Sequence, residues 1–234
     1  DRLPQILWQL LDEEGFRIGF EEALQRTDAL ARQRLLPTWH AHQLLHTTAE
    51  KQSPQPVTDE ARLGLRQMLR CHDFLAPKLR VALAELAMSA LPSAEVRHQL
   101  EPLLDSIRGD RRRFASLALT WARQLVDDRL FGDAKQWLDV VNKDAPEPIG
   151  SPLLTALQGR RVGAFAVTHP GQAGDLGSGY SFGGHCGVWL LRLQGDELAQ
   201  TPAWVDLQRQ VSLPSIFPVL DVARTDGEAH VVMP

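Results

Sequence analysis

The sequence predicts an α+β protein in which an all-α helical region precedes a small antiparallel β-sheet domain with one helix. Apolar residues recur every three or four positions from Leu3 to Val141, the period of helices that bury one face. After Gly150 the pattern changes to short β-favouring runs with many glycines between them. The predicted organisation is a helical array or bundle over 1–145, a linker over 146–159 and a β-rich domain over 160–234.

The helical region is predicted to hold helices at 4–14, 19–34, 38–49, 58–73, 76–91, 93–108, 112–129 and 131–142. The expected breakers are Gly15, Pro37, Ser53–Pro56, Pro77, Pro92 and Gly109. Thr58 and Ser93 each precede acidic residues, so their hydroxyls are predicted to cap the following helices. A single helix cannot bury its own apolar stripe, so each helix is expected to pack against neighbouring helices. The segment 114–141, FASLALTWARQLVDDRLFGDAKQWLDVV, resembles the helix-turn-helix pattern of tetratricopeptide-like repeats.

Histidines in this region raise the question of a metal site. His42 and His46 lie four residues apart on one face of a predicted helix, as metal ligands can, and His40 precedes them. The run Cys71-His72-Asp73 adds further ligand types. No second half of a ligand set stands at a recognisable spacing, so the sequence favours structural histidines and predicts no metal site.

Net charge and composition indicate which classes of partner are not expected. The net charge of −4 and the pI of about 6.1 give no overall attraction for nucleic acid or anionic lipid. The cluster of Arg108, Arg111, Arg112 and Arg113 is mixed with acidic residues and lacks interleaved aromatics, so a solvated helix start is favoured. No apolar run is long enough for a membrane span. We expect neither nucleic acid nor membrane as a partner.

The two cysteines are far apart in the chain, which favours a reducing, cytoplasmic location over a disulfide-stabilised secreted domain. The neighbours His185 and Cys186 suggest a thiol and its base, yet adjacent strand residues point to opposite faces, so cysteine catalysis is not expected. The chain opens without an initiator methionine, and both ends are expected to be cut from a longer protein.

The last region is predicted to run strand, glycine-rich connection, strand, helix and hairpin. The strands are RVGAFAV (161–167) and GVWLLRL (187–193), and the helix is TPAWVDLQRQV (201–211) with Thr201 as its cap. FPVLDV and AHVVM flank Asp226-Gly227, a strong hairpin signal. The glycines between the first two strands are interpreted as a floppy connection in preference to a functional loop, because isolated glycine motifs are weak signals.

This order, with LPSIFPVLDVARTDGEAHVVMP at its end, resembles the N-terminal lobe of the eukaryotic-like protein kinase fold. The resemblance covers roughly residues 160 to 234, and only the last part is specific. It implies that Leu213–Ile216 follow the lobe's helix and that Phe217–Val222 and His230–Met233 are its last two strands. Met233 would be the gatekeeper residue and Pro234 the first residue of the hinge, where the chain stops.

Kinases cover the nucleotide phosphates with a glycine-rich loop and hold them with a lysine that is paired with a glutamate. The resemblance implies a nucleotide-binding set of Gly177, Gly179, Gly183, Arg192 and Met233. The sequence departs from the family here, because no lysine follows Lys143 and the lysine position falls near Leu191. The predicted helix offers only Asp206 as an acid. An intact clamp is absent, and neither ATP nor Mg²⁺ is firmly expected as a cofactor.

These observations predict an interaction or regulatory fragment of a larger signalling protein, in which a helical scaffold joins a degenerate kinase-like lobe that is not catalytic by itself. Its partner would be another protein or the remainder of its own chain, and we assign no catalytic or metal-binding residue. One alternative is the front part of an active ATP-dependent serine/threonine protein kinase, with Arg192 replacing the lysine. Another is a protein-binding module unrelated to kinases, which would be favoured if the last two strands did not pair.

Overall fold

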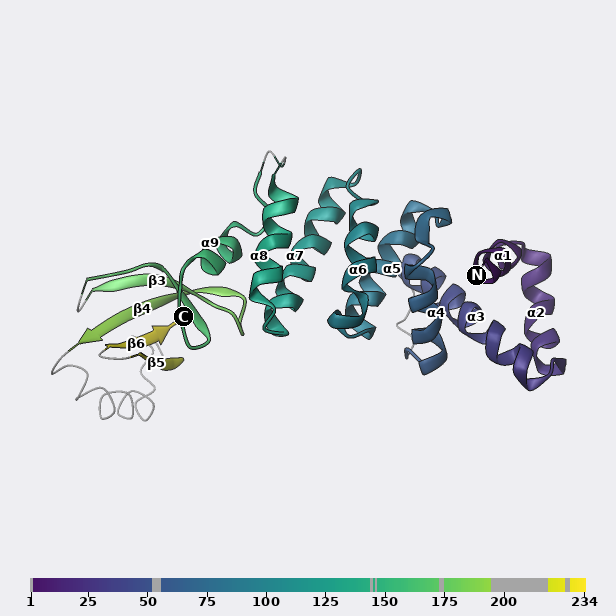
Figure 1. Cartoon of the computed structure of the whole chain (residues 1–234), viewed down its shortest axis with the longest axis horizontal. Coiled ribbons are helices and arrows are strands. Elements are labelled where there is room, and N and C mark those ends of the chain that lie inside the picture. Colours follow the sequence, from purple (N-terminus) through teal and green to yellow (C-terminus); the bar gives the residue numbers. More distant parts are fainter. Residues whose placement is uncertain are drawn as a thin grey trace. The chain divides into compact units, whose positions relative to one another are not determined.

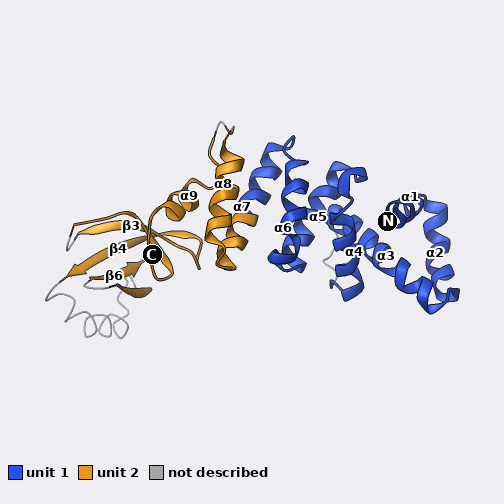
Figure 2. Cartoon of the chain, viewed as in Figure 1, with its two compact units in different colours: residues 1–120 blue, residues 121–234 orange. Residues whose placement is uncertain are grey.

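The structure is a computed structural model that describes residues 2–51, 56–143, 145, 147–172, 175–194, 219–225 and 228–234. The chain divides into two compact units, Asp1–Thr120 and Trp121–Pro234 (Figure 2). Helices come first in the chain and strands follow, which confirms the α+β class (Figure 1). None of the helices in the described ranges is long and apolar enough to cross a membrane.

The first unit consists of successive packed helices (Figure 1). They are α1 (Leu3–Leu11), α2 (Glu14–Arg26), α3 (Ala29–Ala49), α4 (Asp59–Leu69), the 3₁₀ turn η1 (His72–Phe74), α5 (Pro77–Ala90), α6 (Ser93–Asp105) and the start of α7 (Arg111–Asp127). Helix α3 contacts α4 and α5, and α4 contacts α5 and α6. Each of these helices therefore packs against the next two in the chain, the arrangement of stacked helix pairs. Leu65, Met68 and Leu83 are among the fully buried side chains between them.

Two predicted helix breaks are wrong. Gly15 lies inside α2 and Pro37 inside α3, and the chain breaks at Thr27 and Asp28 instead. The Asp28 carboxylate accepts a hydrogen bond from the Ala31 amide at 2.9 Å, so it caps α3. The predicted cap at Thr58 is confirmed by its hydroxyl, which accepts from the Ala61 amide at 3.2 Å.

The predicted cap at Ser93 is wrong. Pro92 occupies the N-cap position of α6, and Ser93 is the first helical residue. Its hydroxyl is buried and has no hydrogen-bond partner among the described residues. The acidic residue in the first turn, Glu95, pairs with Arg66 of α4 at 2.6 Å, so it fastens two helices together.

Helix α4 approaches α3 closely at Pro37. A Cβ atom on Gly64 would lie 1.9 Å from the Pro37 carbonyl oxygen and 2.8 Å from Ala41 Cβ, which no real side chain tolerates. The packing of α3 against α4 thus requires glycine at this position. Pro37 itself lacks the N–H that would donate to the carbonyl four residues earlier, and α3 nevertheless continues through it.

The second unit combines helices with an antiparallel sheet. Its elements after α7 are α8 (Phe131–Asn142), α9 (Ser151–Gln158), β1 (Arg160–Val162), β2 (Phe165–His169), β3 (Leu176–Ser181), β4 (Cys186–Gln194), β5 (Asp221–Thr225) and β6 (Glu228–Met233). The strand order is β1-β2-β3-β4-β6-β5, and every neighbouring pair is antiparallel. The edge strand β1 also contacts the other edge strand β5, so the sheet is strongly curled. Helix α9 lies within the segment predicted as a linker.

The curled sheet encloses an apolar core built from alternate residues of its strands. Val162, Phe165, Val188, Leu190, Ala223 and Val232 form this cluster. The predicted strand over 161–167 is in fact the β1–β2 hairpin. Its two-residue turn has Gly163 at a φ of 60°, a conformation that favours glycine.

The glycine-rich segment is not a floppy connection in its second half, because Leu176–Ser181 form strand β3 between β2 and β4. Strands β5 and β6 pair antiparallel, with Val222 opposite Val231. The predicted helix over 201–211 with its cap at Thr201, the turn at Leu213–Ile216 and the Asp226-Gly227 turn all lie outside the described residues.

Candidate functional site

Arg192 is the only cation predicted to contact nucleotide, and the structure places it on β4 opposite His230 of β6. Its Nη2 atom donates to Glu228 Oε1 at 2.5 Å. Gln194 Nε2 donates to the same oxygen at 3.1 Å, and Arg160 Nη1 donates to Glu228 Oε2 at 3.4 Å. The hydrogen bond from Arg192 is the main reason why the pKa of Glu228 lies below its usual value. The guanidinium is therefore neutralised by a carboxylate of its own sheet.

Leu191, the residue nearest the expected lysine position, lies opposite Val231 and is half-buried. Successive strand residues point to opposite faces, so Leu191 and Arg192 lie on different sides of the sheet. Neither residue reproduces the clamp of a kinase. Leu191 carries no charge, and Arg192 is paired with Glu228 of the adjacent strand rather than with an acid of a helix.

The predicted glycines at 177 and 179 lie within β3, where they allow close backbone packing. A Cβ atom on Gly177 would lie 2.6 Å from the His169 carbonyl oxygen. One on Gly179 would lie 2.5 Å from Leu190 Cδ1 and 2.7 Å from the Ala166 carbonyl oxygen. These glycines are explained by the fit of β3 between β2 and β4.

The third predicted glycine, Gly183, lies in the four-residue turn between β3 and β4. This turn is fixed at both ends. Phe182 is buried against Phe131 at a ring centroid distance of 5.1 Å, and His185 Nε2 lies 3.0 Å from Asp127 Oδ1. The Ser181 hydroxyl accepts from the Gly184 amide at 3.2 Å. Its contacts resemble those of an anchored structural turn.

The structure does not bring the five predicted nucleotide residues together. Met233 is three residues beyond His230 on β6, so it lies on the face opposite to Arg192. The turn with Gly183 adjoins Cys186 at the start of β4, and the six residues from there to Arg192 span about 20 Å of strand. The connection between β2 and β3, which contains Gly171, lies nearer the Arg192 end of the sheet.

An apolar cavity of about 560 Å³ opens on the face of the sheet that carries Trp189. Helix α9 and strands β2, β3 and β4 line it with Ser151, Pro152, Thr155, Thr168, His169, Ser178, Gly179, Tyr180, Gly187, Val188 and Trp189. None of these lining residues is a lysine, an arginine or an acid. The Trp189 side chain is 50% exposed and lies opposite Ser178 in the strand register.

The polar groups of this cavity are mostly paired with one another. The Thr168 hydroxyl lies 3.0 Å from the carbonyl oxygen and from the hydroxyl of Ser178, and His169 Nδ1 lies 3.0 Å from the Ser178 hydroxyl. Burial raises the pKa of Tyr180, although Arg123 opposes this effect, so the phenol stays neutral. The cavity therefore offers an aromatic and aliphatic surface with few groups left to bind charge.

Other sequence candidates have structural roles. Cys71 Sγ donates to the Gln67 carbonyl oxygen at 3.1 Å, and burial raises the pKa of this thiol. Arg108 and Arg113 pair with aspartates three residues away, as expected for a solvated helix start. His185 Nε2 pairs with Asp127 Oδ1 at 3.0 Å, and no hydrogen bond joins His185 to Cys186 among the described residues.

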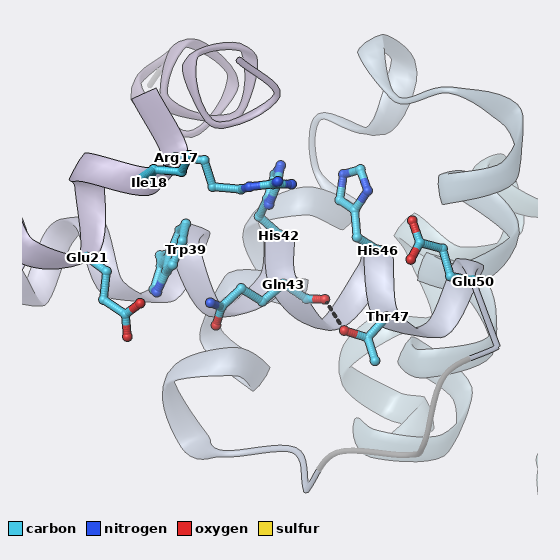
Figure 3. Close-up of a pocket in the computed structure, with 9 residues that line it drawn as sticks. All are labelled: Arg17, Ile18, Glu21, Trp39, His42, Gln43, His46, Thr47 and Glu50. Atoms are coloured by element: carbon cyan, nitrogen blue, oxygen red, sulfur yellow. Dashed lines mark hydrogen bonds between the residues drawn. The ribbon is translucent and has the colours of Figure 1, made fainter. Parts of the chain in front are cut away.

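The predicted histidine pair on α3 has a third neighbour that the sequence did not reveal. His42 Nε2 lies 2.9 Å from Asp12 Oδ1, and His46 Nε2 lies 3.4 Å from the same oxygen. The two rings project from the same side of α3 into a cavity of about 450 Å³, and Arg17 of α2 extends beside His42 (Figure 3). Asp12 is the C-cap residue of α1, thirty residues before His42.

Comparison with protein-family models, with curated proteins and with solved structures finds no match for this chain.

Proposed function

We propose that this chain is a non-catalytic protein-interaction module, in which a helical scaffold joins a degenerate kinase-like lobe that binds a partner protein through its sheet. The observation that carries the proposal is the pairing of Arg192 with Glu228. In a kinase the phosphate-binding cation is paired with a glutamate of the lobe's helix, whereas Arg192 is paired with a carboxylate on the adjacent strand, and its Nε atom is buried. The surface that remains available is apolar.

The pairing of β5 with β6 supports the kinase-like part of the proposal. The resemblance requires the last two strands to form an antiparallel hairpin beside the strand that carries the clamp residue, and the register has this arrangement. An unrelated binding module would not need it. An active parent kinase that used Arg192 in place of lysine would have to bind phosphate with a guanidinium whose carboxylate partner lies on the neighbouring strand.

The binding surface that we propose is centred on Trp189. Tryptophan is enriched among residues that dominate protein interfaces, because it buries a large rigid area. Leu176, which is 57% exposed, lies on the same face of β3, two residues before Ser178. Trp189 and Leu176 form an apolar patch beside the cavity. The cavity could receive an aromatic or branched aliphatic side chain of a partner protein.

The proposed setting is the cytoplasm, in a protein that takes part in signalling. Both cysteines are free thiols in the structure, Cys71 half-buried and Cys186 exposed, which suits a reducing compartment. The proposed partner is a protein segment because the cavity lining lacks the cations that nucleic acid or nucleotide phosphates require.

Selection of a displayed peptide library on the intact chain tests this function. We expect enrichment of peptides with an aromatic or aliphatic anchor, and loss of their binding in Trp189→Ser. Val140→Ser is the matched control, because Val140 is a similarly exposed apolar residue on α8, away from the patch. Failure to enrich any peptide, or equal binding by both variants, would refute the proposed surface.

A further inference from the structure

The first unit contains a cluster of ligand atoms that the proposed function does not use. Asp12, His42 and His46 each offer one ligand atom, and all three atoms lie within 4.8 Å of one another. We propose that these residues form a binding site for a divalent transition-metal ion of the zinc type, with two imidazoles and one carboxylate as ligands.

The spacing of the atoms fits such an ion. A tetrahedral ion with bonds of about 2.0–2.1 Å holds its ligand atoms about 3.3 Å apart. The two separations between Asp12 Oδ1 and the histidine Nε2 atoms are 2.9 Å and 3.4 Å. The third separation, between the two Nε2 atoms, is at most 4.8 Å, so the site can close around an ion through movement of the side chains.

The local fold sets up this geometry. His42 and His46 are four residues apart on α3, so one helical turn places both rings on the same side. Their ring centroids are 4.4 Å apart, and Trp8 of α1 packs against His42 at 4.6 Å. The same helix α1 ends at Asp12, so the packing of Trp8 fixes the carboxylate beside the histidines.

The hydrogen bond between His42 and Asp12 satisfies only some of the polar atoms in the cluster. His46 Nε2 is buried and has no hydrogen-bond partner among the described residues, because its 3.4 Å contact with Asp12 lacks hydrogen-bond geometry. Leaving such an atom unsatisfied costs free energy. A metal ion between the three side chains satisfies it, with each neutral imidazole carrying its proton on Nδ1.

The ligand types select the class of ion. Two imidazoles with one carboxylate suit zinc and its first-row neighbours, whereas Mg²⁺ and Ca²⁺ prefer oxygen ligands. Three protein ligands leave a fourth position open, as in zinc sites that bind water or a small anion. His42 and His46 line the cavity shown in Figure 3, so a fourth ligand has room there, and an anionic one would meet Arg17.

The test measures metal content and affinity on the intact chain, with Zn²⁺ in equilibrium dialysis and Co²⁺ as an optical probe. We expect one ion per chain and an intense visible Co²⁺ spectrum of the tetrahedral type. Asp12→Asn and His46→Gln alter half-exposed side chains, so both variants should fold. Each should weaken binding by more than the roughly 10–100-fold that loss of even an outer-shell partner causes.

His40→Gln is the matched control, because His40 lies on the same helix outside the cluster. It should bind the ion as the wild type does. The absence of stoichiometric binding by the wild type would overturn the proposal. So would wild-type affinity in Asp12→Asn and His46→Gln, or an equal loss in His40→Gln. The peptide experiment at Trp189 reports on a different unit, so either proposal can fail alone.

Discussion

Arg192 Nη2 donates to Glu228 Oε1 across the β4–β6 strand pair at 2.5 Å, in a sheet where the kinase-like resemblance calls for a cation that binds phosphate. Hydrogen bonds between charged groups are about twice as strong as neutral ones, so the pair holds its geometry. The acceptor oxygen is shared with Gln194, and the second carboxylate oxygen contacts Arg160. The charge of Arg192 therefore contributes to the stability of its own sheet.

Gly179→Ala tests whether the glycines of β3 serve packing. The new Cβ atom would lie 2.5 Å from Leu190 Cδ1 and 2.7 Å from the Ala166 carbonyl oxygen. We expect a loss of about 1–3 kcal/mol in the free energy of unfolding, the usual cost of overpacking. Chemical denaturation monitored by circular dichroism measures it.

Gly183→Ala is its control, because a Cβ atom there meets nothing within 4 Å and the residue needs no positive φ. It should leave stability within about 0.5 kcal/mol of the wild type, as most surface substitutions do. If Gly183→Ala were the more harmful of the two, the turn and not the strand would carry the constraint on glycine.

Gly64→Ala tests the close packing of α4 against α3 at Pro37. Its Cβ atom would lie 1.9 Å from a backbone carbonyl oxygen, which cannot rotate away, so α3 and α4 must separate. We expect destabilisation by about 1–3 kcal/mol or more, measured as a lower urea midpoint.

Gly19→Ala in α2 provides the opposite case within the same unit. A Cβ atom at Gly19 meets nothing within 4 Å, and alanine has the higher helix propensity. This substitution should be neutral or stabilise by up to about 1 kcal/mol. Equal effects of the two substitutions would show that the close approach of α4 to Pro37 is not what requires glycine at position 64.

The burial of His230 predicts that the stability of the sheet depends on pH. Burial is the main reason that its pKa lies below the usual value, Arg160 and Arg192 lower it further, and Glu228 opposes them. The unfolded chain therefore takes up a proton before the folded one does. Stability is greatest above the ordinary histidine pKa of about 6.5 and falls as the pH drops below it.

His230→Gln removes this titration. The wild type should lose stability relative to this variant as the pH is lowered from neutral to mildly acidic, and thermal melts of both proteins across that range measure the difference. The comparison isolates His230 from His42, whose pKa burial also lowers. A difference between the two proteins that stays constant with pH would contradict the assignment.

The order of helices and strands was predictable from the sequence because period and composition are local properties. The cap at Thr58 was equally local. Pro37 was misjudged because the sequence around it does not show that α3 continues through it and packs closely against Gly64 of α4. The glycine-rich segment was misjudged because its glycines reflect the neighbours of β3, which only the sheet register reveals.

The candidate sites were predictable only in part for the same reason. His42 and His46 were visible as a pair at helical spacing, but Asp12 lies thirty residues earlier and joins them through the packing of α1 on α3. The sequence showed Arg192 as a cation one residue away from the expected lysine position. Its partner Glu228 lies 36 residues later, on a strand that pairs with β4, so sequence spacing gave no sign that the charge was occupied.

The most direct test of the interaction-module account follows two side chains by ¹⁵N-resolved NMR on the intact chain, the Trp189 indole N–H and the Arg192 Nε–H. Trp189→Phe and Arg192→Lys assign the two signals. A selected apolar peptide and Mg²⁺ with ATP are then added in separate titrations. The account predicts that the peptide shifts the Trp189 signal and that ATP leaves the Arg192 signal unchanged. A saturable, Mg²⁺-dependent shift of Arg192 with ATP, and none of Trp189 with peptide, would contradict it.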